Sequence, residues 1–302
     1  MQNLGKKILL AILFLLLPVL VMAEPVDPDY VVEEVYINAA VDLLGSMHVQ
    51  EAYVVKGSIN GFKRILEYKN EKFPDWEEGK VDFSGSSFYN GRGMNLSKVY
   101  AYKIDQDEIG WSLLSRKEDS FSEVGRASNG DKGVFTKKSI DTGLDLRVYN
   151  STSSGYTVFY FDYYVNQAVV LHNDIAELYY TFFKLDENVG KVNLQVLTPW
   201  SMKQDYFRFW AHGALNGEIS GISESKDEDG NYFYKGVLAT IENYKKSDPV
   251  EIRMTMGRTG FESVEKILND SKMDAFEAIV EVETERASEA NKKRILNKAL
   301  YF

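Results

Sequence analysis

The chain has no cysteine, only 6 prolines and only 3 histidines among its 302 residues. Without cysteine it holds no disulfide, no thiolate nucleophile, no zinc finger and no iron–sulfur cluster. Lys and Arg number 35 against 45 Asp and Glu, so the formal net charge is −10. Because phosphate binding needs a basic face, this balance argues against a nucleic-acid partner. Charged residues at 26% and apolar residues at 44% are typical of a folded protein and exclude global disorder.

The motifs of several enzyme classes are missing too. The sequence contains no Gly-x-Gly-x-x-Gly, Walker or Gly-x-Ser-x-Gly pattern. The three histidines, His48, His172 and His212, lie far apart in unlike contexts. A histidine-based metal site needs ligands that converge, and this spacing does not indicate convergence. We therefore interpret them as isolated structural or surface residues.

One acidic segment, Asp227–Asn231, resembles the start of a calcium loop. Tyr232 stands where such a loop needs glycine, and Leu238 stands where it needs glutamate. The segment is therefore interpreted as an acidic hairpin tip. We predict no catalytic, cofactor-binding or metal-binding residue and no cofactor. A carbohydrate-acting or cell-wall hydrolase stays open, because 45 acidic residues allow many pairs of carboxylates.

The N-terminus has the order of a secretory signal peptide. Two basic residues, Lys6 and Lys7, precede an apolar run of 15 residues over 8–22, and small residues precede Glu24. At 1.5 Å per residue this run spans about 22 Å, less than the roughly 30 Å of a hydrocarbon core. We predict cleavage after residue 23 and export of the mature chain. An uncleaved membrane anchor is the alternative.

Most of the mature chain, from residue 35 to about 260, carries the pattern of β-strands. Apolar residues alternate with polar ones, which places one set on a core face and the other in solvent. The alternating sets are Val35/Ile37/Ala39/Val41, Leu144/Leu146/Val148, Val192/Leu194/Val196 and Ile252/Met254/Met256. Turn signals separate these runs at Asn60-Gly61, Asn90-Gly91, Asn129-Gly130, Asn216-Gly217 and Asp229-Gly230. This combination predicts a mainly β fold, an antiparallel β-sandwich.

The aromatic segment Tyr156–Val165 carries large rings at both alternating sets of positions. It predicts a central strand covered on both faces, with a sugar-binding aromatic platform as the alternative. A change of pattern near 184–190 divides the β region into two immunoglobulin- or fibronectin-like subdomains, 24–185 and 186–260. One continuous larger sandwich is the alternative.

The C-terminal segment, 261–302, has no proline or glycine and is rich in good helix formers. From Lys272 it predicts a helix of up to 31 residues, roughly 46 Å long. Its acidic residues, Glu283 among them, come first and its basic residues last, which suits the helix dipole. We interpret it as a solvated stalk with one narrow packing stripe. Its basic and apolar end, 292–302, also suits an anionic membrane surface.

Three stretches together resemble a known family. They are 35–65 with its VYINAAV and NGFKRI sequences, 169–180 with NDIAELYY, and 211–219 with AHGALNGEI followed by VEIR at 250–253. The chain resembles the predicted bacterial membrane proteins with domain of unknown function 2207, from about residue 34 to 260 and in the helix after 270. The resemblance implies a signal, an exported β-rich region and then transmembrane helices. The sequence stops at Phe302, about where the first of these helices is expected.

These observations predict an exported cell-envelope protein at the extracellular face of the bacterial membrane. Its β-sandwich ectodomain is expected to have a non-catalytic binding or structural role, with an envelope protein or a glycan as partner. Membrane association is expected through the C-terminal helix or through a segment after Phe302. The cell-wall or carbohydrate-acting hydrolase is the alternative.

Overall fold

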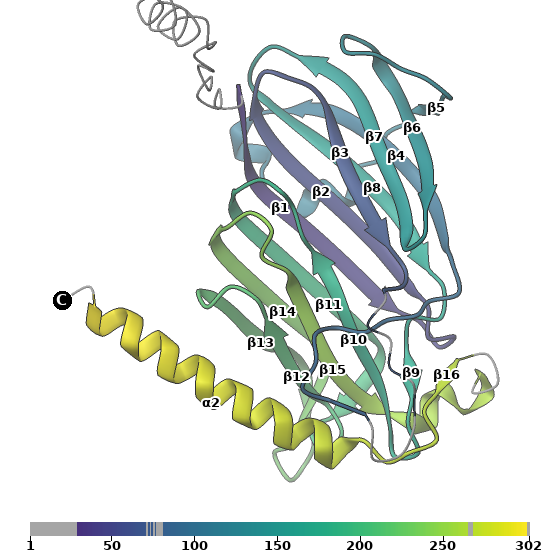
Figure 1. The fold of residues 1–302 in the computed structure, drawn as a ribbon, viewed down its shortest axis with the longest axis vertical. Helices are drawn as coiled ribbons and strands as arrows, with labels where there is room; N and C mark the ends of the chain where they lie inside the picture. Colours follow the sequence, from purple (N-terminus) through teal and green to yellow (C-terminus); the bar gives the residue numbers. More distant parts are fainter. Residues whose placement is uncertain are drawn as a thin grey trace, which may run out of the picture.

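The computed structural model of the chain describes residues 29–70, 72, 74, 76, 81–264 and 268–300. The predicted signal peptide, 1–23, lies outside these residues. The described part is mainly β with one long C-terminal helix, as predicted. Its strands form three sheets of seven, five and four strands, shown in Figure 1.

The seven-stranded sheet forms one layer of the molecule. Its order is β13 (Gly217–Lys226), β14 (Tyr232–Tyr244), β11 (Val189–Lys203), β1 (Tyr30–Val41), β2 (Met47–Gly57), β8 (Tyr156–Val165) and β4 (Met94–Ile104). The predicted aromatic strand is β8, which lies between β2 and β4 and is buried over most of its length. The prediction of a covered central strand is therefore confirmed.

Two smaller sheets face this layer. The five-stranded sheet has the order β12 (Arg208–His212), β15 (Val250–Gly257), β10 (Ile175–Phe183), β9 (Val170–Leu171) and β16 (Asn269–Asp270). The four-stranded sheet has the order β3 (Ile59–Glu67), β7 (Gly143–Thr152), β6 (Lys132–Ile140) and β5 (Ser122–Glu123). The main core lies between the layers and includes Ile37 of β1, Leu146 of β7 and Met254 of β15.

A second, smaller core lies on the other face of the seven-stranded sheet. There the short 3-10 helices η1 (Gln106–Glu108) and η2 (Trp111–Ser115) follow β4. Leu113 and Leu114 of η2 pack against Tyr36, Tyr100 and other rings of the sheet. Part of this outer face is thus covered. The residues packed there alternate along their strands with residues whose side chains line the main core.

The prediction of purely antiparallel sheets is wrong at three pairs. β1 runs parallel to β11, β5 to β6 and β16 to β9. Alternation within a strand reports which face is buried but not the direction of the neighbouring strand. The β1–β11 pair also joins strands from both sides of the boundary predicted at 185 and 186, which the division into two subdomains did not anticipate. That division stays a prediction.

The turn signals have mixed outcomes. Asp229-Gly230 lies at the tip between β13 and β14, so the predicted acidic hairpin tip is confirmed. Asn60-Gly61 is no hairpin turn: it lies inside β3 at a register shift, where a Cβ on Gly61 would stand 2.4 Å from the Val148 carbonyl oxygen. Asn216-Gly217 connects β12 in one sheet to β13 in another, so it is not a hairpin either.

The predicted C-terminal helix is confirmed as α2 (Phe276–Leu300), which begins four residues after the expected start. A 3-10 helix, η3 (Arg258–Val264), and β16 precede it. Lys272 has a positive φ of 57°, which is incompatible with a right-handed helix there. Figure 1 shows α2 crossing the lower strands and extending past β13. No helix among the described residues is long and apolar enough to cross a membrane.

Candidate functional site

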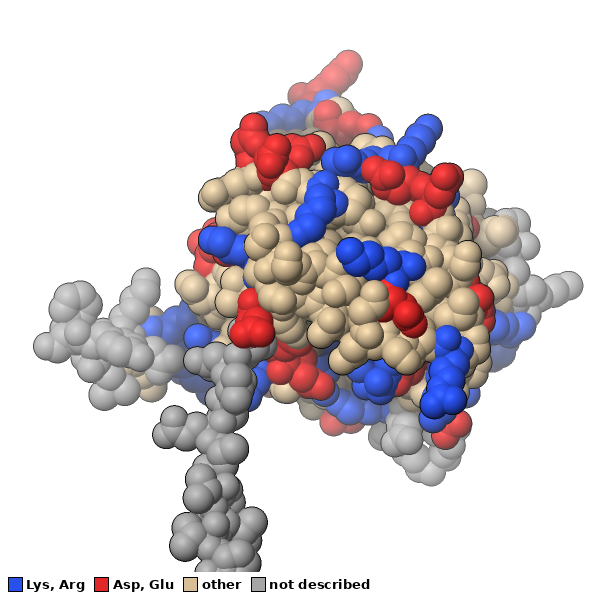
Figure 2. Space-filling view, turned by 90° about the horizontal axis from the view of Figure 1, so that it is seen from above, with Lys and Arg blue, Asp and Glu red and all other residues tan. Residues whose placement is uncertain are grey.

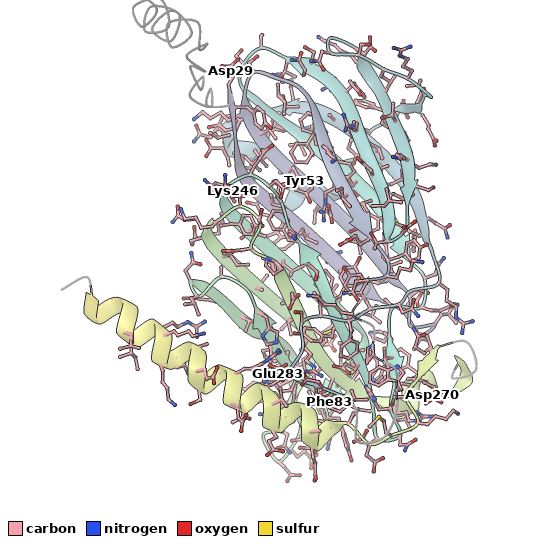
Figure 3. The ribbon with its side chains drawn as sticks, in the orientation of Figure 1. Asp29, Tyr53, Phe83, Lys246, Asp270 and Glu283 are labelled. Atoms are coloured by element: carbon pink, nitrogen blue, oxygen red, sulfur yellow. The ribbon has the colours of Figure 1, made fainter. Side chains whose placement is uncertain are left out.

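The strongest site candidate is a buried set of charged and imidazole groups under the start of α2, here called the Arg253 cluster. It consists of His172, Glu177, His212, Arg253 and Glu283, which come from the turn after β9, β10, β12, β15 and α2. Segments as far apart as residues 172 and 283 therefore meet at one place. Figure 3 shows Glu283 on α2 facing the sheet near Phe83.

The members of the Arg253 cluster form one continuous chain of contacts. Arg253 Nε donates to Glu177 Oε1 at 2.6 Å, and Arg253 Nη1 donates to Glu283 Oε1 at 2.8 Å. His172 Nε2 lies 2.8 Å from Glu177 Oε2, and His212 Nε2 lies 3.1 Å from Glu283 Oε2. Each carboxylate thus contacts the arginine on one side and an imidazole on the other.

Burial gives these contacts their energetic weight. Arg253, Glu177 and His172 have no exposed surface, and Glu283 is 1% exposed. Burial alone would raise the pKa of Glu177, but attraction to Arg253 and hydrogen bonding from His172 outweigh it and hold that pKa below its usual range. Burial acts on Glu283 in the same way, and His212 and Arg253 lower its pKa. Both carboxyls are therefore held in the ionised form, which does not suit a general acid.

Aromatic rings enclose the arginine. The Arg253 guanidinium carbon lies 4.8 Å from the Tyr179 ring centroid, 5.8 Å from that of Phe83 and 5.9 Å from that of Phe88. Arg253 Nη1 also donates to the Phe83 carbonyl oxygen at 2.8 Å. The cluster is thus closed over by the segment that holds Phe83 and Phe88, and its arrangement fits a structural clamp for α2.

Other side chains hold α2 along its length. The Asp174 carboxylate accepts from the backbone N–H groups of Ala275 (3.0 Å) and Phe276 (2.9 Å), which caps the helix N-terminus. Further along, Arg286 donates to the Gly85 carbonyl oxygen at 2.6 Å and Arg294 to that of Leu215 at 2.8 Å. The helix is therefore fixed to the connections between strands at its start, its middle and near its end.

A second buried ion pair, here called the Arg64 cluster, lies between the sheets. Arg64 of β3 donates from Nε and Nη2 to both carboxylate oxygens of Glu51 at 2.8 and 2.9 Å. Tyr53 and Tyr163 donate to the same carboxylate at 2.7 and 2.8 Å. Burial alone would lower the pKa of Arg64, but Glu51 raises it well above its usual value.

Arg64 also joins the two smaller sheets. Its guanidinium donates to the carbonyl oxygens of Phe182 (3.3 Å) and Lys184 (3.5 Å) at the edge of β10. Tyr180 of β10 donates in return to the Glu67 carbonyl oxygen of β3. A cleft of about 310 Å³ lies over this contact. Since every N–H of Arg64 already has an acceptor, the guanidinium is a bridge between sheets rather than a free ligand group.

The interpretation of the histidines as isolated is wrong for two of them. His172 and His212 meet in the Arg253 cluster through Glu177, Arg253 and Glu283, because the sheet brings distant segments together. His48 lies apart on the seven-stranded sheet, 2.9 Å from Asp162. Among the residues that the structure describes, no group of three or more His, Asp or Glu is arranged to hold a metal ion.

Glu283 is one of the acidic residues of the predicted stalk helix, and it was not predicted to lie on the packing stripe. It is buried, and the signal for this lies in its spacing. Phe276, Ile279 and Glu283 recur every three to four residues, so Glu283 continues the apolar stripe of the helix. An acidic residue on such a stripe indicates a buried partner. The later part of α2 is solvated as predicted, with residues 291–296 exposed.

The segments that carry the family resemblance supply both clusters. Glu177 lies in NDIAELYY, His212 in AHGALNGEI, and Arg253 in VEIR. Arg64 lies in NGFKRI, at the end of the first stretch. The end of the molecule seen in Figure 2 carries basic and acidic side chains interspersed with uncharged ones, without a field of one sign.

A family model described as the N-terminal domain of a predicted membrane protein (DUF2207) matches residues 31–256. No curated protein matches the chain. Among solved structures, a putative protease from Parabacteroides distasonis has 9% identity and a TM-score of 0.35 over 75% of this chain and 40% of its own. Leukotriene A4 hydrolase from Saccharomyces cerevisiae has 10% identity and a TM-score of 0.30 over 75% and 29%. An M1 zinc metallopeptidase from Deinococcus radiodurans has 8% identity and a TM-score of 0.32 over 75% and 42%.

The chain thus spans less than half the length of each of these three structures. At such identities and scores the likenesses carry no argument about activity.

Proposed function

The chain belongs to the DUF2207 family of predicted membrane proteins, and on that premise we propose that it is an exported envelope protein with a non-catalytic ectodomain. In this proposal the seven-stranded sheet and the two smaller sheets form a β-sandwich at the extracellular face of the cell membrane. The ectodomain binds or positions a partner, which is an envelope protein or a glycan.

The observation that carries the proposal is the attachment of α2. Glu283 joins the helix to Arg253 inside the sheet, and Asp174 caps its N-terminus. The helix then continues into solvent with Ile295 67% exposed and Leu296 63% exposed. A clamped helix with an apolar, basic end holds the ectodomain in a fixed direction relative to a membrane surface.

A non-catalytic role rests on the state of the buried acids. Glu177 and Glu283 are paired on both carboxylate oxygens with arginine or imidazole nitrogens. Their pKa values are lowered, whereas a catalytic acid at neutral pH needs a raised one. Incubation of the protein with purified peptidoglycan is expected to release no soluble fragments, and released fragments would favour the hydrolase alternative.

Export is tested on the full chain with a C-terminal epitope tag, expressed in a bacterial host. We expect the tag in the membrane fraction, with the ectodomain digested by protease added to intact spheroplasts. A cytosolic protein with an uncut leader, protected from the protease, would refute the proposal.

The membrane contact of α2 is tested separately with vesicles of phosphatidylglycerol and phosphatidylcholine. The double variant Ile295→Glu/Leu296→Glu removes the exposed apolar residues, so we expect it to sediment with vesicles at least several-fold less than the wild type. Ala287→Glu/Ser288→Glu is the matched control, since it adds the same charge at exposed positions of the same helix. Equal loss in both variants would mean that charge alone, rather than apolar contact, governs binding.

A further inference from the structure

One part of the seven-stranded sheet is unlike the rest of this charged protein. On the outer face, where η1 and η2 do not reach, register places Leu238, Gln195, Asn38, Gln50 and Asp162 side by side on β14, β11, β1, β2 and β8. Residues directly opposite each other in paired strands point to the same face. Their strand neighbours such as Ile37 and Val49 are buried in the main core, so this row points outward.

Three carboxamides form the centre of the row. Gln195, Asn38 and Gln50 lie on adjacent strands, which are about 4.8 Å apart, and all three are half-buried. The Gln50 amide donates to the Tyr160 hydroxyl at 2.8 Å. The side-chain amides of Asn38 and Gln195 form no hydrogen bond with the described residues. Their donors and acceptors are therefore open to an external ligand.

The charge at this face is small and compensated. Asp162 lies 2.9 Å from His48 and 3.5 Å from the Tyr160 hydroxyl, and exposed Lys98 of β4 pairs with it across the strands at the end of the row. No lysine or arginine lies among the three central positions. A nucleic acid or a polyanion needs cations at its contact surface, so this surface fits neither.

Two exposed aromatic rings flank the amides along the strand direction. On one side Trp111 of η2 is 36% exposed and packs edge-on against Tyr36, with ring centroids 5.4 Å apart. On the other side Tyr164 is 41% exposed and stacks on His48, with ring centroids 4.4 Å apart. On the outer face, the cross-strand pair that contains Tyr36 lies next to that of Asn38 in one direction along the strands. The pair that contains His48 lies next to it in the opposite direction. Four residues along a strand separate these two pairs, roughly 13 Å.

We propose that this surface, the amide platform formed by Asn38, Gln50, Gln195, Trp111 and Tyr164, binds a neutral glycan chain. Sugar hydroxyls donate and accept at once, which matches the paired donor and acceptor of a carboxamide. The apolar faces of sugar rings pack on flat aromatic side chains such as Trp111 and Tyr164. The centre of a protein interface is instead enriched in aromatic residues, Met and Arg, whereas here the centre is amide. This inference rests on the proposed function and names its partner.

The test uses the full 302-residue chain and three soluble probes: the β-1,4 hexamers of N-acetylglucosamine and of glucose, and a mannose hexamer. Binding is measured by isothermal titration calorimetry. We expect at least one hexamer to bind, and Asn38→Ala and Gln195→Ala each to weaken it by tenfold or more. Trp111→Phe tests the aromatic edge and is expected to weaken it by a smaller factor. Gln204→Ala, an exposed amide in the turn after β11, is the matched control and is expected to bind like the wild type.

Each other result rejects the inference in a distinguishable way. No binding of any hexamer by the folded wild type rejects a neutral glycan, and the export experiment then still decides the proposed function. Binding that Asn38→Ala and Gln195→Ala leave intact places the glycan elsewhere and rejects the amide platform. A photo-crosslinker at Asn38 that joins an envelope protein in cells, with no hexamer binding, replaces the glycan by a protein partner. Unchanged urea midpoints in the variants exclude unfolding as the cause of any loss.

Discussion

Replacement of Arg253 by methionine is the sharpest test of the clamp that holds α2. Arg253→Met keeps most of the side-chain volume but removes the positive charge between Glu177 and Glu283. Glu177 would then be buried beside His172 alone, and Glu283 would keep only His212 and the partly exposed Arg286. Loss of one partner from a buried ion pair costs about 3–5 kcal/mol, because the remaining charge is left without compensation.

For a domain of this size, a loss of about 3–5 kcal/mol corresponds to a decrease in Tm of roughly 6–20 °C. Urea unfolding followed by tryptophan fluorescence gives the free energy, and differential scanning calorimetry gives the Tm. Hydrogen exchange of α2 supplies a local measurement: its protection is expected to fall further than that of β2 and β8, which lie far from the cluster.

A matched control uses an exposed pair. Lys235→Met breaks the Lys235–Glu224 pair, whose nitrogen and oxygen are 3.5 Å apart on the surface, and is expected to cost less than about 1 kcal/mol. The double variant Arg253→Met/Glu283→Leu removes both charges of one pair and is expected to recover part of the loss, a coupling of about 0.5–3 kcal/mol. A loss below about 1 kcal/mol in Arg253→Met would refute the clamp.

Three further predictions concern pH, the helix cap and a close backbone contact. The pKa values of Glu177 and Glu283 are lowered from 4.5, so the stability that these carboxylates contribute is complete above that pH and is lost as the pH falls through their folded-state pKa values. The urea midpoint should therefore drop between about pH 5 and pH 3, and a constant midpoint would contradict this. Asp174→Ala removes the cap of α2 and should cost about 0.5–2 kcal/mol with early fraying of the helix in hydrogen exchange, whereas Asp174→Asn should retain most of the stability. Gly143→Ala would place a Cβ 1.9 Å from the Leu66 carbonyl oxygen, so it should destabilise the β3–β7 pair and lower the Tm; a Tm equal to that of the wild type would contradict the observed packing.

The strands were predictable because alternation is a local property. Val35 and Ile37 are buried on one face of β1, as their spacing of two residues requires. The aromatic strand was predictable for a related reason, because rings at both alternating sets of positions leave no face for solvent. The helix followed from the absence of glycine and proline, although its first residue depends on the distant Asp174.

The pairing of strands was not predictable in the same way. β1 and β11 are neighbours although about 150 residues separate them, and nothing in either strand encodes the direction or identity of the other. The Arg253 cluster and the Arg64 cluster both depend on pairings between strands that are distant in the sequence. His172 and His212 have no sequence relationship that indicates a common site, and the sheet alone brings them to Glu177 and Glu283.

The amino-acid sequence by itself determined the balance of charge, the lack of thiol chemistry, the faces of the strands and the existence of the C-terminal helix, since each is set by composition or by neighbours a few positions away. Only the tertiary structure decided which strands pair, that Arg253 lies between two buried glutamates, and that Asn38 and Gln195 lie side by side on one outer face. The physical reason is that strands pair through hydrogen bonds between residues that can be any distance apart in the sequence. The periodicity of apolar residues, by contrast, depends only on neighbours a few positions away.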